Sequence, residues 1–208
     1  MNKIKSILLI ANGRESGAPC LQKLARRHDL VIALDGGADN ALAAGIMPDL
    51  ALGDLDSISA AAKKKLGELR LLQIPRQDNT DLEKGLDFAV YLKPKNITIT
   101  NATGGRVDFT ISNLMCVFNY TKKAQIVFEG ENWRIYPVEE TRKFTCKKGA
   151  TISLLPVSDC KGITLKNLQY PLKNAPLQPW QTAMSNVALK NNFEVQIKKG
   201  KLLVMVYG

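Results

Sequence analysis

The pattern of apolar segments changes once along the chain, near residue 130. Before that point, short apolar runs that suit buried strands alternate with amphipathic helical patterns. We expect strands near residues 5–11, 30–34, 50–52, 70–74, 96–100 and 124–128, and helices near residues 18–27, 38–44, 58–67, 81–92 and 109–121. Such regular alternation favours a parallel sheet covered by helices, so we predict an α/β domain over residues 1–130.

After residue 130 the helical patterns stop, and β-prone segments separated by turn residues follow. We expect strands at residues 133–138, 142–146, 151–155, 162–166, 182–185, 193–197 and 202–207. Short strands at this spacing are typical of a small sandwich or barrel. The prediction for residues 131–208 is therefore an all-β domain of the β-sandwich kind.

The chain is basic, with a formal net charge of +10 over 208 residues, and most of the excess lies after residue 110. The lysines of this part occur as short pairs without interleaved aromatic residues or a recognisable RNA- or DNA-binding motif. We therefore expect no nucleic-acid partner. The surplus charge is better suited to solubility and to attracting small molecules that carry phosphate.

Cysteine usage and the first apolar run indicate the compartment. Cys20, Cys116, Cys146 and Cys160 are scattered without a Cys-x-x-Cys pair, which predicts neither a zinc site nor a disulfide framework. The apolar run near the N-terminus is too short for a signal peptide or a membrane span. We expect a cytoplasmic protein without a membrane partner.

Two aspartates follow the apolar run at residues 50–52. Side chains alternate between the two faces of a strand, so Asp54 and Asp56, two residues apart at the end of this run, can point both carboxylates the same way. Paired carboxylates suit Mg²⁺, which binds one or two of them and completes its coordination with water and substrate phosphates. The spacing predicts Asp54 and Asp56 as ligands of a magnesium ion.

Each of the first five predicted strands is followed by glycine, aspartate or arginine. In an open sheet of this Rossmann-like kind, ligands bind outside the carboxyl ends of the strands. Glycine lets backbone approach a phosphate, and an arginine neutralises its charge. The residues in these positions are Asn12 and Gly13; Asp35, Gly36 and Gly37; Asp54 and Asp56; Asp78 and Asp81; and Gly104, Gly105, Arg106 and Asp108.

Taken one at a time, these residues have plainer interpretations. Asp81 at a helix start complements the helix dipole, Asp78 suits an ordinary turn, and the Gly-Gly pairs suit plain turns. Asp54-x-Asp56 alone is also found in metal-dependent glycosyltransferases. It is the ordered combination that is specific.

Five motifs in order resemble the signature of the thiamine pyrophosphokinase family. They are Asp35-Gly-Gly-Ala, Gly45-x-x-Pro-Asp49, Gly53-Asp-x-Asp-Ser57, Asp78-x-Thr-Asp-Leu-Glu83 and Gly104-Gly-Arg-x-Asp108. Residues 152–156, residues 162–172 and Met184-Ser-Asn186 are similar to the family's second domain, so the resemblance spans nearly the whole chain. It implies a catalytic α/β domain, a thiamine-binding β-sandwich and a homodimer with thiamine near the subunit interface.

The resemblance implies transfer of the β,γ-diphosphate of ATP to the hydroxyl of thiamine, which releases AMP. Chemistry of this kind depends on positioning and charge neutralisation. We expect Asp54, Asp56 and Asp81 to bind Mg²⁺, and Asp78, Asp81, Arg106 and Asp108 to be catalytic. Asp78 or Asp108 would orient or deprotonate the hydroxyl, while Arg106 would stabilise the polyphosphate.

The remaining expected contacts divide between the two substrates. The ATP site is expected to be lined by Asn12, Gly13, Asp35, Gly36, Gly37, Gly104, Gly105 and Arg106. By resemblance, Gln77, Thr80, Ser185 and Asn186 would bind thiamine. The family usually has histidine directly after Arg-x-Asp, where this chain has Phe109, a ring without hydrogen-bonding atoms. We expect activity to be retained, since the acidic and Gly-Gly-Arg residues are all present.

Three other functions remain open. A diphosphokinase for another hydroxymethyl heterocycle, such as a pterin, would need the same carboxylates. A glycosyltransferase acting on nucleotide sugars would use Asp54-x-Asp56 but gives no reason for Gly104-Gly-Arg-x-Asp108. A non-catalytic binder of thiamine or nucleic acid would need no acidic cluster.

Overall fold

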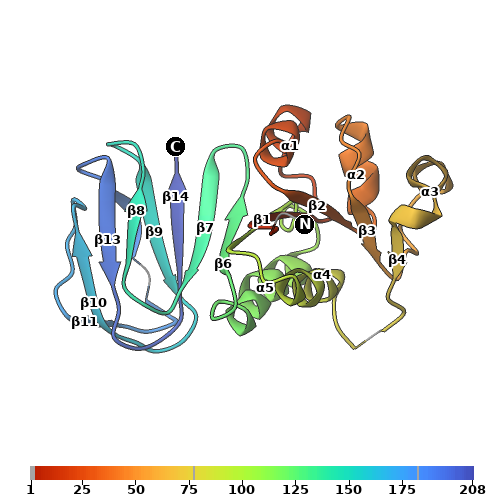
Figure 1. Cartoon of the computed structure of the whole chain (residues 1–208). Helices are drawn as coiled ribbons and strands as arrows, with labels where there is room; N and C mark the ends of the chain where they lie inside the picture. Colours follow the sequence, from red (N-terminus) through yellow and green to blue (C-terminus); the bar gives the residue numbers. More distant parts are fainter. Residues whose placement is uncertain (1–2, 77, 182) are drawn as a thin grey trace. The chain divides into compact units, whose positions relative to one another are not determined.

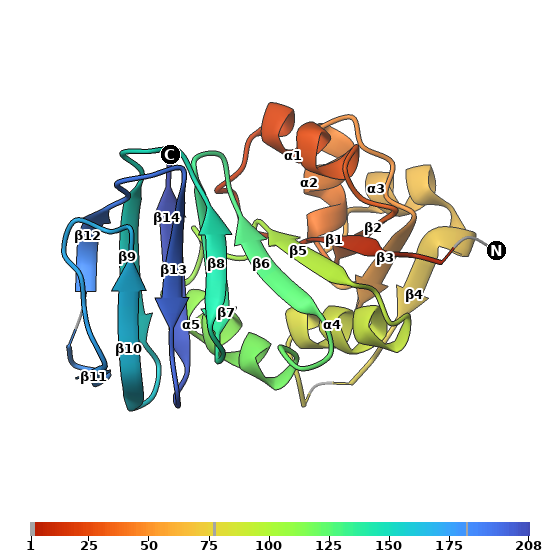
Figure 2. The same ribbon diagram turned by 60° about the vertical axis from the view of Figure 1, so that its left-hand side comes forward.

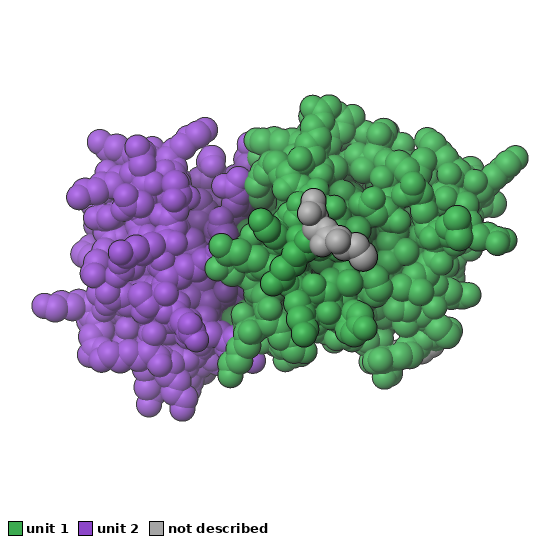
Figure 3. Space-filling view, in the orientation of Figure 1, with its two compact units in different colours: residues 1–131 green, residues 132–208 purple. Residues whose placement is uncertain are grey.

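The structure is a computed structural model that describes residues 3–76, 78–181 and 183–208. The chain divides into two compact units, and the division falls between Glu131 and Asn132 (Figure 3). Each unit has its own architecture and is described by itself.

The first unit contains a parallel sheet, as the alternation of strands and helices predicts. Its described strands lie in the order β6-β5-β1-β2-β3-β4. They are β1 (Ser6–Ile10), β2 (Leu30–Leu34), β3 (Leu50–Gly53), β4 (Leu71–Gln73), β5 (Asn96–Thr100) and β6 (Gln125–Glu129). In β1, the four residues from Ile7 to Ile10 are fully buried, because helices cover both faces of the sheet.

Helices cover the two faces of this sheet unequally. They are α1 (Ala18–Ala25), α2 (Gly37–Ala43), α3 (Ala60–Leu66), α4 (Asp81–Tyr91) and α5 (Val107–Cys116), with short 3₁₀ turns η1 (Glu68–Arg70) and η2 (Val117–Asn119). The helices α1, α2 and α3 lie on one face, and α4 and α5 lie on the other (Figure 1). Figure 2 shows the same two layers from a second direction. Among the described residues, no helix combines the length and the apolar character that crossing a bilayer requires.

The strand order reverses beside β1. Strand β1 pairs with β2 on one side and with β5 on the other. The chain leaves β1 toward α1 on one face and leaves β5 toward α5 on the opposite face (Figure 1). Because the two connections diverge, a crevice is expected at the carboxyl ends of these strands.

Helix α4 begins as the sequence predicts. The hydroxyl of Thr80 accepts a hydrogen bond from the backbone N–H of Glu83 at 3.3 Å, and the Glu83 carboxylate accepts one from the backbone N–H of Thr80 at 2.9 Å. This capping box satisfies two N–H groups that the first helical turn leaves free. The first helical residue, Asp81, is thereby held at the carboxyl edge of the sheet.

The second unit contains two antiparallel sheets with a hydrophobic core between them. The strand orders are β12-β9-β14-β7 and β11-β10-β13-β8. The strands are β7 (Trp133–Val138), β8 (Arg142–Thr145), β9 (Thr151–Pro156), β10 (Cys160–Lys166), β11 (Ala175–Leu177), β12 (Ala183–Val187), β13 (Asn192–Gln196) and β14 (Leu202–Tyr207). Ile152 and Val204 from the first sheet pack in one cluster with Ile163 and Phe193 from the second. The predicted fold class, an α/β domain followed by a β-sandwich, is confirmed.

The predicted elements differ from the observed ones mainly at their ends. The helix expected at 109–121 begins earlier, at Val107, and ends at Cys116, where the 3₁₀ turn η2 follows. Strand β11 was not predicted, because its three residues include a proline and have no alternating pattern. A three-residue strand depends on its partner, here β10, more than on its own sequence.

Helix α2 lies so close to β1 that its first residue cannot carry a side chain. A Cβ atom added to Gly37 would lie 2.2 Å from the backbone oxygen of Ile10, which cannot move aside. We expect Gly37→Ala to lower the free energy of unfolding by about 1–3 kcal/mol, although alanine favours helices.

Urea unfolding followed by circular dichroism measures this difference. The matched control is Gly105→Ala, where the added Cβ meets no atom within 4 Å. Equal midpoints for the two variants would contradict the close packing of α2 on β1.

Candidate functional site

A pocket of about 340 Å³ lies at the carboxyl edge of the first unit's sheet, where the strand order reverses. It is formed by the segments that follow β1, β2, β3 and β5 and by the first turns of α4 and α5. Its lining residues are Ala11, Asn12, Gly13, Leu34, Asp35, Ser57, Thr80, Asp81, Leu82, Asn101, Ala102, Thr103, Gly105, Arg106, Phe109, Thr110 and Asn113. Gly36 and Gly104 adjoin lining residues in the chain, and Gly37 directly follows Gly36. The structure therefore brings all the residues expected to line the ATP site to this one edge.

Glycine is required where the loops of this edge meet. The backbone N–H of Gly13 donates to the carbonyl oxygen of Asn101 at 2.6 Å, and a Cβ on Gly13 would lie 2.5 Å from that oxygen. A Cβ on Gly36 would lie 2.4 Å from the Asn12 side chain. The segments after β1, β2 and β5 can therefore approach one another only because side chains are missing.

Three carboxylates come together beside the pocket. One oxygen each of Asp35, Asp54 and Asp81 lies within 4.8 Å of the others. Asp35 follows β2, Asp54 follows β3, and Asp81 begins α4. The backbone of Asp35 has a φ of +44°, and its Oδ1 accepts the backbone N–H of Ser57 at 3.2 Å, so the side chain has a defined direction.

A lysine balances part of this charge. The Nζ atom of Lys84 lies 3.0 Å from Oδ1 of Asp81 and 3.5 Å from Oδ2 of Asp54. Burial raises the pKa of Asp81, and the ammonium of Lys84 opposes that shift only in part. Burial also acts to raise the pKa of Asp54, but the N–H of Asp56 and the ammonium of Lys84 lower it on balance.

Asp56, predicted as a metal ligand with Asp54, lies outside this group. Strand β3 ends at Gly53, and Leu55 has a φ of +65°, so the side-chain alternation of a strand does not extend to these aspartates. The Asp56 side chain is exposed and accepts the hydroxyl of Ser57 at 3.0 Å. Asp35, expected at the ATP site, lines the pocket and also lies beside Asp54.

Two exposed aspartates are paired with neighbouring arginines. Arg106 forms a two-point ion pair with Asp108, with Nε 3.1 Å from Oδ1, and its guanidinium carbon lies 4.7 Å from the centre of the Phe109 ring. Asp78 forms a similar pair with Arg76, with Nε 3.0 Å from Oδ1. These hydrogen bonds lower the pKa of Asp108 and of Asp78, so both stay ionised.

The residues expected to bind thiamine are divided between the units. Thr80 lines the pocket, and Gln77 lies outside the described residues. In the second unit, Asn186 is buried and bonds to the backbone of Tyr170 through both its amide nitrogen and its oxygen. Ser185 is exposed and has a φ of +57°.

Sequence reasoning missed two charged residues at this edge. Lys84 could have been found, because a lysine three residues after Asp81 lies on the same side of a helix. Glu15 gave no signal: its Oε1 accepts the backbone N–H of Thr103 at 3.2 Å, across 88 residues of sequence. That contact joins the loop after β1 to the loop after β5.

Two protein-family models match the chain. "Thiamin pyrophosphokinase, catalytic domain" matches residues 21–128, and "Thiamin pyrophosphokinase, vitamin B1 binding domain" matches residues 132–202. The first match covers the acidic group of Asp35, Asp54 and Asp81 and all of the pocket lining after residue 20, but not Ala11, Asn12 and Gly13. The second match covers most of the β-sandwich.

Individual relatives agree with these matches. Thiamine pyrophosphokinase of Bacillus subtilis (strain 168) is 29% identical over 212 residues, which cover 98% of this chain and 98% of that protein. The crystal structure of the Bacillus subtilis protein superposes with a TM-score of 0.83 at 28% identity and covers 98% of this chain and 99% of that one. Thiamin pyrophosphokinase from Candida albicans superposes with a TM-score of 0.85, covering 99% of this chain and 90% of that one, and at 18% identity it shows the shared fold alone. The chain therefore belongs to the thiamine pyrophosphokinase family, as its motifs indicated, and is a transferase by family.

Proposed function

We propose that this protein transfers the β,γ-diphosphate of ATP to the hydroxyl of thiamine, giving thiamine diphosphate and AMP. The observation that carries the proposal is the group Asp35, Asp54 and Asp81 at a glycine-lined pocket where the strand order reverses. Carboxylates alone would repel a polyphosphate, so this arrangement favours a cation that lies between the carboxylates and the phosphates. Family membership supplies ATP and thiamine as the substrates.

The residues present fit Mg²⁺. All three side chains offer carboxylate oxygens, the hard donors that this ion prefers. A Cβ on Gly53 would lie 3.1 Å from both the Asp35 side chain and Oδ1 of Asp81, so glycine keeps space open within the group. We propose Asp35, Asp54 and Asp81 as the residues that hold the ion. When bound, Mg²⁺ would neutralise charge on the polyphosphate as it is transferred.

The remaining groups would act by positioning. Backbone at Gly13 and Gly105 approaches the pocket without side chains and would accommodate the nucleotide. Arg106 would leave Asp108 to bind phosphate oxygens as a planar two-point donor. The freed Asp108, or Asp78, would then orient the hydroxyl of thiamine or accept its proton; both carboxylates are exposed to solvent.

The other expectations from the sequence stay predictions. They are the contacts of Gln77, Thr80, Ser185 and Asn186 with thiamine, the cytoplasmic location, and the absence of nucleic-acid and membrane partners. We also propose a homodimer. Its support in the structure is the exposed apolar side of α5, where Val107, Ile111 and Met115 are each more than half exposed.

The reaction is tested with purified protein, ATP, Mg²⁺ and thiamine. We expect AMP and thiamine diphosphate in equal amounts, despite phenylalanine at position 109. AMP no higher than in a control without thiamine would contradict the proposal. AMP formed only with a hydroxymethyl pterin would favour the related diphosphokinase, and turnover of a nucleotide sugar would favour the glycosyltransferase.

The metal assignment is tested by comparing Asp54→Asn with Asp56→Asn. We expect Asp54→Asn to lower kcat by about 10²-fold or more, because a bound metal contributes several kcal/mol of charge stabilisation. Asp56 lies outside the acidic group, so Asp56→Asn should lower kcat much less than Asp54→Asn does. Asp159→Asn, an exposed aspartate in the second unit, serves as the matched control.

Equal decreases in kcat for Asp54→Asn and Asp56→Asn would show that Asp56 also holds the ion. Near-normal rates in the Asp54 variant would remove the acidic group from the mechanism.

A further inference from the structure

Lys84 is buried, although it carries a charged side chain. Only 3% of that side chain is exposed, and it lies on α4 one turn after Asp81. A lysine is rarely buried to this degree unless its charge is paired. Its partners are the carboxylates of Asp81 and Asp54, at 3.0 and 3.5 Å. Lys84 therefore belongs to the acidic group as its internal counter-ion.

The packing of α4 holds Lys84 against the two carboxylates. The lysine has a fixed place, because Gly85 beside it packs on Leu34 of β2, so closely that a Cβ on Gly85 would lie 2.4 Å from the Leu34 side chain. Helix α4 cannot easily shift to withdraw the ammonium.

The carboxylates and the lysine differ in their exposure to solvent. The side chains of Asp54 and Asp81 are 20% and 33% exposed, so solvent reaches part of each carboxylate, whereas the Lys84 side chain that contacts them is only 3% exposed. Asp35 and Asp81 both line the pocket. A cation that enters the pocket from solvent therefore meets the carboxylates of Asp35 and Asp81.

We propose that Lys84 is a built-in counter-ion of this site, which positions Asp54 and Asp81 and limits the acidic group to one divalent ion per chain. The inference rests on the proposed function in taking the acidic group as the metal site. It goes further by assigning a positioning residue and a stoichiometry.

Charge and space support a single ion. Three carboxylates and one ammonium carry a net charge of −2, which one divalent cation neutralises. Two-metal sites place their ions about 3.5–4 Å apart with carboxylates between them. Here the ammonium already contacts two of the three carboxylates, where a second metal would have to bind.

The number of ions can be counted by titrating Mn²⁺ into the full-length, nucleotide-free protein and following free Mn²⁺ by electron paramagnetic resonance. We expect one Mn²⁺ per chain for the wild type. Lys84→Met, which keeps the side-chain length and removes the charge, should bind a second Mn²⁺ or bind one about tenfold tighter or more, since a nearby positive charge has been removed.

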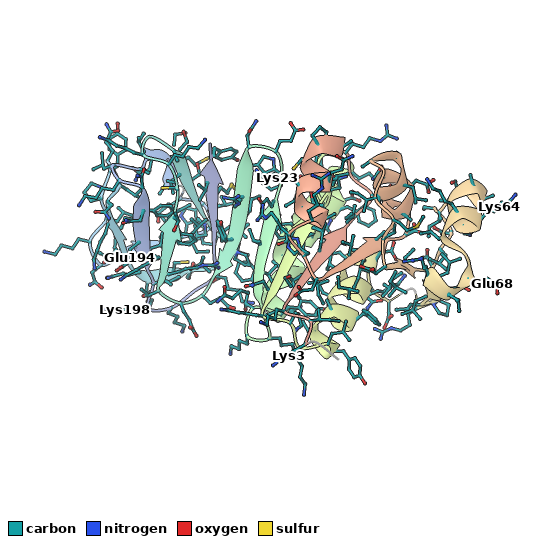
Figure 4. The ribbon with its side chains drawn as sticks, turned by 45° about the horizontal axis from the view of Figure 1, so that its top comes forward. Lys3, Lys23, Lys64, Glu68, Glu194 and Lys198 are labelled. Carbon is teal, nitrogen blue, oxygen red and sulfur yellow. The ribbon has the colours of Figure 1, made fainter. Side chains whose placement is uncertain are left out.

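Lys64→Met is the matched control, because Lys64 is an exposed lysine at the far end of the sheet, on α3 (Figure 4). It should bind one Mn²⁺ with wild-type affinity. Two Mn²⁺ ions per wild-type chain, no binding, or the same stoichiometry and affinity in the Lys84→Met variant would each overturn the proposal.

A crystal structure of the wild type with Mn²⁺ gives a test that does not depend on how well the variant folds. We expect one anomalous peak on the pocket side, with Lys84 still within 4 Å of both Asp54 and Asp81. Two peaks, or a lysine that has moved away from the carboxylates, would overturn the proposal. An enzyme that forms AMP from ATP and thiamine but binds two ions would keep the proposed function and lose only this inference.

Discussion

Three carboxylates within 4.8 Å of one another repel each other, and the first unit places compensating positive charge around them. Two unit charges about 4 Å apart interact by about 4 kcal/mol at the effective dielectric of a protein surface. That is a large part of the 5–15 kcal/mol by which a typical domain is stable. The ammonium of Lys84 and the N–H group that Ser57 donates to Asp35 offset this repulsion from within the protein. The open side is left for a cation from solution.

The carboxylates meet because three separate parts of the chain end at one edge. Asp35 follows β2, Asp54 follows the neighbouring strand β3, and Asp81 begins the helix that packs beneath them. Neighbouring parallel strands end side by side, so the sheet order alone brings the first two together. The capping box at Thr80 and Glu83 then fixes where α4 starts, and with it the position of Asp81. The grouping of the three carboxylates is thus a consequence of strand order and one helix cap.

The fold could be read from the sequence because its signals are local. Apolar runs, helix periodicity and the Thr80-x-x-Glu83 pattern each depend on neighbouring residues, and the structure confirms the α/β domain, the β-sandwich and the cap. The membership of the acidic group was less predictable. The left-handed backbone at Leu55 interrupts the alternation of side chains along the strand, so Asp56 does not join Asp54. A leucine in the sequence does not indicate a left-handed conformation. Contacts between residues far apart in the sequence, such as Glu15 with Thr103, produce no local sequence pattern from which they could be predicted.

The central claim is that this edge of the sheet moves a diphosphate as one unit. The most direct measurement uses ATP that carries distinguishable isotopic labels in its β- and γ-phosphates, incubated with the protein, Mg²⁺ and thiamine, followed by mass spectrometry of the products. If the diphosphate moves as one unit, both labels reach thiamine together, in one thiamine diphosphate for each AMP formed. Transfer of the γ-label alone, with ADP as the other product, would contradict it.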